Sequence, residues 1–166
     1  MATFSITQIL LSSTGSALAG AAVYHLVANT IERQRSKYSV LTELRRNYRS
    51  LQKISDRTRG DSWDGVIHNG LRTTARDRLE TRTPKLRFDL TDDEQRELSD
   101  LYGLYDYINR LHIVSVSGDR GDLPAENVRS LVGDAQSLTE SVYGSLRDRW
   151  HVAAYRTEPE LPTPEV

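Results

Sequence analysis

The first thirty-one residues of the chain contain no Asp, Glu, Lys or Arg, although charged residues make up 27% of the whole sequence. Inside this stretch, Ile6–Ala28 is a run of apolar and small residues, long enough to cross a bilayer as one α-helix. The strongly basic segment Glu32–Arg59 follows directly. This order predicts that residues 1–31 form a single transmembrane anchor.

The charge that follows the apolar run predicts an orientation. Residues 32–59 contain nine basic and three acidic residues, whereas the remainder of the chain contains thirteen basic and twenty acidic ones. Because basic residues concentrate on the cytoplasmic side of membrane helices, we expect the N-terminus outside and the C-terminal domain in the cytoplasm of a cell-membrane protein. Membrane lipid is then a predicted partner. The basic side chains assigned to its head groups are Arg33, Arg35, Lys37, Arg45, Arg46 and Arg49. A solvated helix face is the alternative.

Small residues recur at intervals of four within the apolar run. Gly15 is followed by Ala19, and Ser16 is followed by Gly20. This spacing lets two helix backbones approach closely in a bilayer, where packing drives helix association. It predicts a homo-oligomer or a membrane-protein partner, and a helix that only tethers the chain is the alternative.

The residues after the anchor predict an all-α fold. No Pro or Gly interrupts Ala21–Arg59, so the anchor is expected to continue as a basic juxtamembrane helix over residues 32–59. Residues 60–155 are predicted to form a small cytoplasmic helical bundle, in which a four-helix arrangement is expected. The tail, residues 156–166, contains three Pro and three Glu and is predicted to be disordered.

Local signals define the helices of this bundle. Asp61–Glu80 reads as two short helical pieces, and Thr91 with Glu94 forms a capping box at the start of a longer helix that ends before Ser117. Pro124 suits the first turn of a last helix. Apolar residues at three- and four-residue spacing predict the packing positions. These are Leu41, Leu44, Tyr48, Leu51, Trp63, Leu101, Tyr105, Ile108, Leu138, Val142 and Trp150.

Two short patterns carry a resemblance. Leu41-Thr-Glu-Leu-Arg-Arg-Asn47 has the form Leu-x-Glu-Leu-x-x-Asn, and Leu101-Tyr102 is followed by Ile108-Asn109, with Trp63 between the two patterns. In these features the chain resembles a loosely defined group of uncharacterised microbial single-pass membrane-anchored helical-bundle proteins. The resemblance implies an anchor and a bundle but no activity. It marks Asn47 and Asn109 as candidates for buried polar contacts between helices, with exposed helix positions as the alternative.

No catalytic or cofactor-binding motif is present in the sequence. The chain has no Cys, and its four His residues lack metal-ligand spacing. The glycines form neither a phosphate-binding loop nor a dinucleotide fingerprint. The Arg-rich helix has no recognisable docking fold for nucleic acid. We therefore expect no enzyme activity, no cofactor, no metal and no nucleic-acid partner.

The predicted function is a non-enzymatic membrane-anchored interaction or scaffold protein. It would present its helical domain at the cytoplasmic face of the membrane, self-associate, or bind a membrane or cytoplasmic protein. The alternative is a membrane-active effector or signal transducer, in which a rearrangement of the bundle changes how the anchor helices assemble.

Overall fold

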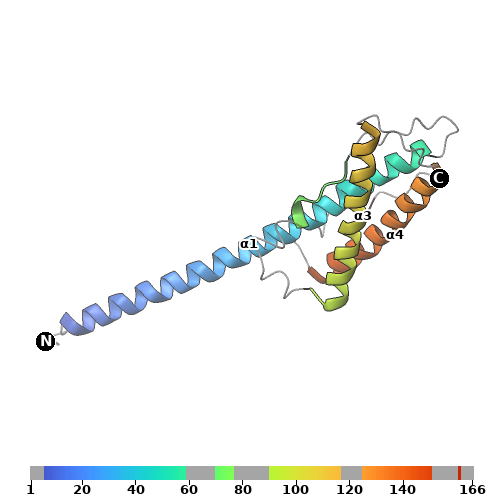
Figure 1. The fold of residues 1–166 in the computed structure, drawn as a ribbon. Coiled ribbons are helices and arrows are strands. Elements are labelled where there is room, and N and C mark those ends of the chain that lie inside the picture. The colour runs from blue at the N-terminus through green and yellow to red at the C-terminus, as the bar shows by residue number, and fades with distance from the viewer. Residues whose placement is uncertain (1–5, 59–69, 77–89, 117–124, 151–160, 162–166) are drawn as a thin grey trace. The chain divides into compact units, whose positions relative to one another are not determined.

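A computed structural model describes residues 6–58, 70–76, 90–116, 125–150 and 161 of the chain; for 6–19 and 112–116 it describes the backbone only. Three long helices, α1 (Ile6–Thr58), α3 (Asp92–Val116) and α4 (Ala125–Trp150), and one helical turn at 74–76 make up the regular structure of these ranges. Figure 1 shows their order along the chain. The predicted all-α class is confirmed for the described residues.

The helix α1 runs without interruption for 53 residues, as the absence of helix breakers in Ala21–Arg59 predicts. It contributes to two compact units, Met1–Arg35 and Ser36–Val166. In the first unit, every side chain from Gly20 to Glu32 is exposed. Over the part of the chain with described positions, no helix combines the length and the apolar character that a membrane crossing requires.

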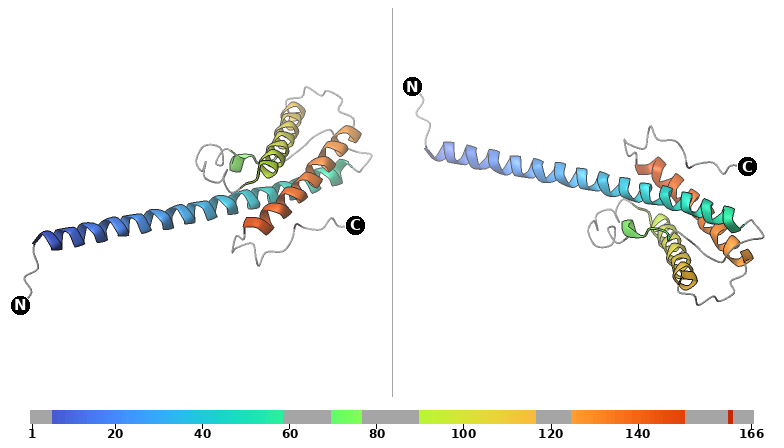
Figure 2. Two further views of the ribbon diagram at one scale, coloured as in Figure 1. Left: turned by 90° about the horizontal axis from the view of Figure 1, so that it is seen from below. Right: turned by 90° about the horizontal axis from the view of Figure 1, so that it is seen from above.

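The second unit is a helical bundle. In both views of Figure 2, α3 and α4 lie against the half of α1 that belongs to this unit. Each pair of helices shares a polar contact: Glu43 with Tyr102, Tyr48 with Glu140, and Tyr105 with Thr139. Burial, together with the bond to Glu140, raises the pKa of Tyr48 to about 12, so its hydroxyl remains a hydrogen-bond donor at neutral pH.

The predicted packing positions form the core of the bundle. A fully buried Leu or Ile side chain contributes roughly 1.5–3 kcal/mol through the apolar surface that it removes from water. Leu138 is partly buried at the edge of the core, and Trp63 lies outside the described residues. The other positions are buried, namely Leu41, Leu44, Tyr48, Leu51, Leu101, Tyr105, Ile108, Val142 and Trp150.

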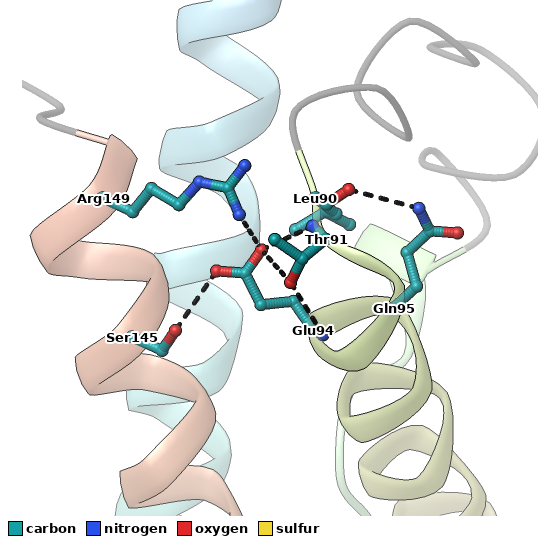
Figure 3. Close-up of polar contacts among 6 residues, drawn as sticks. All are labelled: Leu90, Thr91, Glu94, Gln95, Ser145 and Arg149. Atoms are coloured by element: carbon teal, nitrogen blue, oxygen red, sulfur yellow. Dashed lines mark hydrogen bonds and ion pairs between the residues drawn. The ribbon is translucent and has the colours of Figure 1, made fainter.

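The start of α3 is fixed by the predicted capping box (Figure 3). The Thr91 N–H donates to the Glu94 carboxylate at 2.7 Å, and the Glu94 N–H donates to Thr91 Oγ1 at 3.2 Å. The same carboxylate accepts a hydrogen bond from Ser145 and pairs with Arg149 near the end of α4. Glu94 therefore caps one helix and holds the end of another.

Replacing Glu94 by alanine should lower the free energy of unfolding of the bundle by about 1–2 kcal/mol, because the cap of α3 and the contacts to α4 are lost together. Glu94→Gln should lose less, since glutamine also completes a capping box. Urea unfolding followed by tryptophan fluorescence measures this. Arg96→Ala is the matched control, because the Arg96–Asp93 pair is largely exposed and contributes little. Equal losses in Glu94→Ala and Arg96→Ala would contradict the assignment.

Two predictions about the bundle need correction or lie outside the described residues. Of the two short helical pieces expected within Asp61–Glu80, the second, from Leu71 to Glu80, is wrong at its start, because residues 71–73 are not helical and the helix covers only 74–76 in the described range. Long-range hydrogen bonds to the backbone, described below, override the local preference. In the described residues, the place of the fourth helix of the expected bundle is therefore taken by an irregular segment, 70–73, and one helical turn, 74–76. The predicted tail, residues 156–166, is described at Leu161 only.

Candidate functional site

Five polar residues of α1 and α3 surround a short segment of the chain. They are Glu43 and Asn47 of α1 and Tyr102, Asp106 and Asn109 of α3; together we call them the clamp, and residues 71–76 the clamped segment. Intervals of three and four residues place the members from each helix on one face of that helix. Each member of the clamp except Tyr102 bonds directly to the clamped segment.

The two asparagines pair with the main-chain groups of two consecutive residues. Asn109 accepts a hydrogen bond from the Leu71 N–H at 2.6 Å and donates to the Leu71 carbonyl at 2.8 Å. Asn47 accepts from the Arg72 N–H at 2.8 Å and donates to the Arg72 carbonyl at 2.7 Å. Each side-chain amide supplies the donor and acceptor that a neighbouring β-strand would otherwise supply.

This pairing explains why the segment lies between the two helices. In an extended chain the N–H and C=O groups of successive residues point to opposite sides. The polar groups of Leu71 meet α3 through Asn109, and those of Arg72 meet α1 through Asn47. An extended segment can satisfy both asparagines only from a position between their helices.

Glu43 holds the helical turn that follows the extended residues. Both of its carboxylate oxygens lie 3.0 Å from the Ala75 N–H, and one also accepts a hydrogen bond from the Tyr102 hydroxyl at 3.0 Å. The carboxylate therefore satisfies an N–H group that the short turn leaves without a helical acceptor. At the end of the segment, Arg76 pairs with Asp106 at 3.0 Å.

Side chains of the clamped segment add apolar contacts. Leu71 and Ala75 are only 5% and 1% exposed and belong to the core of the bundle. Arg72 and Thr74 are exposed. The clamp thus recognises main-chain groups, two buried apolar side chains and one basic side chain.

Burial controls the protonation of the clamp. It raises the pKa of the Glu43 carboxyl above its ordinary value of 4.5, against the opposing effect of the Ala75 N–H, the Tyr102 hydroxyl and the charge of Arg72. Burial and then the charge of Glu43 raise the pKa of the Tyr102 hydroxyl, which therefore stays protonated and can donate. Glu43 is a carboxyl group whose ionised form is stabilised mainly by the clamped segment and Tyr102.

The network continues from the clamp to α4. The rings of Tyr102 and Tyr105 meet edge to face, with centroids 5.7 Å apart. The hydroxyl groups of Tyr105 and Thr139 are 2.8 Å apart, and Thr139 also donates to the Ala135 carbonyl. Burial raises the pKa of Tyr105 too. The clamped segment is therefore coupled to all three long helices.

The polar groups of the clamp face other parts of the chain itself. The polar groups of the clamp are directed at peptide groups and one guanidinium of the chain itself. Across the described ranges, no cluster of three or more His, Cys, Asp or Glu residues that could hold a metal ion occurs. Main-chain recognition is the chemistry that these residues support.

The structure places the predicted lipid-contacting residues in two environments. Arg35, Arg46 and Arg49 are exposed, whereas Arg33, Lys37 and Arg45 are half-buried. The Lys37 ammonium lies 5.7 Å from the ring centroid of Trp150, a cation–π contact within the bundle. The exposed basic side chains of the bundle half of α1 form one stripe at three- and four-residue spacing, namely Arg46, Arg49, Lys53 and Arg57.

Of the predicted helix-packing residues in the anchor, only Gly20 has a described environment. A Cβ atom added at Gly20 would meet nothing within 4 Å. The side chains at Gly15, Ser16 and Ala19 lie outside the described set. The chain itself leaves room for a larger residue at position 20.

The sequence predicts only two of the five clamp residues as buried polar contacts. Asn47 and Asn109 were candidates for buried polar contacts, and the structure confirms that Asn47 is 1% exposed. Their partner is the main chain of the clamped segment rather than another helix. The roles of Glu43, Tyr102 and Asp106 were missed. A useful signal was present in the pattern Glu43-x-x-x-Asn47, which places two polar residues on the buried face of a helix.

Comparison with known proteins adds no further assignment. No protein-family model, no curated protein and no solved structure matches the chain.

Proposed function

We propose that the protein is a non-enzymatic interaction protein, anchored in the cell membrane by the N-terminal part of α1 and able to associate with copies of itself. The bundle would stand at the cytoplasmic face, with the N-terminus outside. The observation that carries this proposal is the continuous exposed and uncharged surface of α1 from Gly20 to Ile31.

Large apolar side chains on this surface are exposed in the part of the chain that the structure describes. Leu26 is 67% exposed and Val23 is 59% exposed. Tyr24, Val27 and Ile31 are also exposed, and no charged residue separates them. Contiguous exposed apolar surface marks a contact with a membrane or another protein. Because the charge-free region extends back to Met1, lipid is the cover that we favour.

The basic stripe supports the proposed orientation. Arg46, Arg49, Lys53 and Arg57 are exposed on the C-terminal side of the charge-free region. Basic residues within about 15–20 residues of a membrane helix concentrate on its cytoplasmic side, and Arg46 and Arg49 follow Ile31 by 15 and 18 residues. This supports a location of the bundle on the cytoplasmic side.

Self-association is supported by the space at Gly20. Because a Cβ atom at Gly20 would meet nothing within 4 Å, the small residue is available for close approach of a second helix. Small residues in membrane helices permit such approach. The proposal therefore assigns the first unit both to the anchor and to helix pairing.

The membrane part of the proposal is tested by alkaline extraction of membranes that contain the full chain. The wild-type protein is expected to remain with the lipid, and Gly20→Arg is expected to be released, because a charge within the apolar run costs about 2.5–3.5 kcal/mol on insertion scales. Gly103→Arg is the matched control, since Gly103 of α3 is also exposed and has equally free space. Release of the wild-type protein would overturn the anchor.

Self-association is tested in mild detergent with two differently tagged copies of the full chain. Gly20→Leu should remain in the membrane but show reduced capture of the second copy, whereas Gly103→Leu should behave like wild type. Undiminished capture by Gly20→Leu would remove the helix-pairing role from this face.

A second candidate function follows from the continuity of α1. One helix without a break belongs to both compact units, so a change in the bundle has a direct covalent route to the N-terminal unit. This supports the signal-transducer alternative. Insertion of two Gly residues after Arg35 should interrupt the helix. It should therefore abolish the transmission of a change in the bundle to the N-terminal unit but leave membrane association intact.

A further inference from the structure

We propose that the clamp of one copy binds residues 71–76 of a second copy in place of its own. Two copies would exchange this segment reciprocally and so form a dimer. The inference rests on the self-association proposed above and assigns a second route to it, within the bundle unit rather than in the anchor.

The first argument is that exchange preserves every contact. The clamped segment forms main-chain hydrogen bonds with Asn47, Asn109 and Glu43, and an ion pair with Asp106. All four partners belong to α1 or α3, and none belongs to a residue adjacent to the segment. A second copy supplies identical groups, and exchange of identical elements is a low-cost route to a dimer.

The second argument is chemical complementarity. The clamp presents the carboxyl groups of Glu43 and Asp106, and the segment carries Arg72 and Arg76. The segment also has Leu71 and Ala75, four residues apart, in buried positions. A ligand therefore needs an extended main chain, a leucine, a small residue four positions later and basic side chains. A second copy of this chain meets all four requirements.

The third argument is the length of the connections. Eleven residues, 59–69, join α1 to the range that contains the segment, and thirteen residues, 77–89, join it to Leu90. At about 3.3–3.6 Å for each extended residue, these connections span at most roughly 36–40 Å and 43–47 Å. These spans set the largest separation of two copies at which the segment can be exchanged between their clamps.

Anchoring favours the exchanged state. Copies confined to one membrane meet at a high effective concentration, which promotes reciprocal binding without any new contact. The exchanged dimer is therefore expected at high surface density and the self-occupied monomer at low density, because association follows mass action.

The test uses the absence of cysteine from the chain. Full-length Arg76→Cys and Asp106→Cys chains, each with its own tag, are expressed together and treated in the membrane with a short bis-maleimide cross-linker. The two positions are in contact in the structure, so exchange predicts a cross-linked pair that carries both tags. Arg76→Cys together with Tyr107→Cys is the control, because Tyr107 is exposed and adjacent to Asp106 in sequence.

The outcomes separate exchange from its alternatives. Exchange is supported if the first pair cross-links between chains much more than the control pair does, and if dilution into excess lipid reduces the product. It is overturned if both pairs cross-link equally. It is also overturned if only a chain carrying both Arg76→Cys and Asp106→Cys cross-links, within itself, because the clamp then holds its own segment. Neither result changes the expected alkaline extraction of wild type or Gly20→Arg, so failure of the inference is distinct from failure of the proposed membrane anchor.

Discussion

Replacement of Asn47 by alanine is expected to lower the free energy of unfolding of the bundle by about 2–4 kcal/mol, since each buried polar group left without a partner costs about 1–3 kcal/mol. The substitution removes both the acceptor for the Arg72 N–H and the donor to the Arg72 carbonyl. Asn47 is 1% exposed, so water has little access to replace these bonds. Asn109→Ala should lose less, because Asn109 is only half-buried.

Tryptophan fluorescence during urea unfolding in mild detergent measures the loss. Trp63 and Trp150 both belong to the unit Ser36–Val166, so the signal reports on the bundle and not on the N-terminal half of α1. Arg46→Ala is the matched control, because this neighbour on α1 is exposed. If Asn47→Ala were as stable as Arg46→Ala, the clamp would contribute nothing to the fold, and the paired hydrogen bonds would have to be reassigned.

The second large effect is expected at Glu43. Its pKa is raised in the folded protein, so the folded chain binds more protons than the unfolded chain at pH values between 4.5 and the raised pKa. The free energy of unfolding should therefore fall as the pH rises through this interval and become independent of Glu43 above it. Glu43→Gln removes this contribution, so the difference in the free energy of unfolding between wild type and Glu43→Gln should change across the same interval.

Glu43→Ala separates the hydrogen bonds from the charge. Alanine leaves the Ala75 N–H and the Tyr102 hydroxyl without their acceptor, and we expect a loss of about 1–3 kcal/mol at every pH. Glutamine still offers one carbonyl oxygen, so Glu43→Gln should retain most of the stability above the titration interval. Urea unfolding at pH values on both sides of 4.5 distinguishes the variants. A wild-type profile parallel to that of Glu43→Gln would show that Glu43 does not titrate in this range.

The elements that follow local rules could be predicted from the sequence. The continuity of α1 follows from the absence of Pro and Gly after position 20, and the start of α3 follows from the reciprocal bonds of Thr91 and Glu94. The packing positions follow from the three- and four-residue spacing of Leu41, Leu44, Tyr48 and Leu51, all buried. Each of these signals lies within one element.

The clamp depends on contacts that no local signal encodes. Asn47 and Arg72 are 25 residues apart in sequence, and Leu71 and Asn109 are 38 residues apart. The second helical piece expected within Asp61–Glu80 has a helix-compatible composition, yet residues 71–73 are not helical, because the two asparagines bind the N–H and C=O groups of Leu71 and Arg72. The contact of Lys37 with Trp150 is likewise not encoded locally, because it depends on the packing of α4 against α1. Tertiary contacts override propensity at these positions.

Recognition of the main chain by Asn47 and Asn109 also determines which residues of the clamped segment can vary. Side chains at Arg72, Thr73 and Thr74 are not fully buried, and the two amide pairs bind peptide groups that every residue except proline provides. The segment can therefore accumulate substitutions at its middle positions while its conformation is retained. Leu71, Ala75 and the clamp residues would form a sparse structural signature, recognisable across sequences that have otherwise diverged.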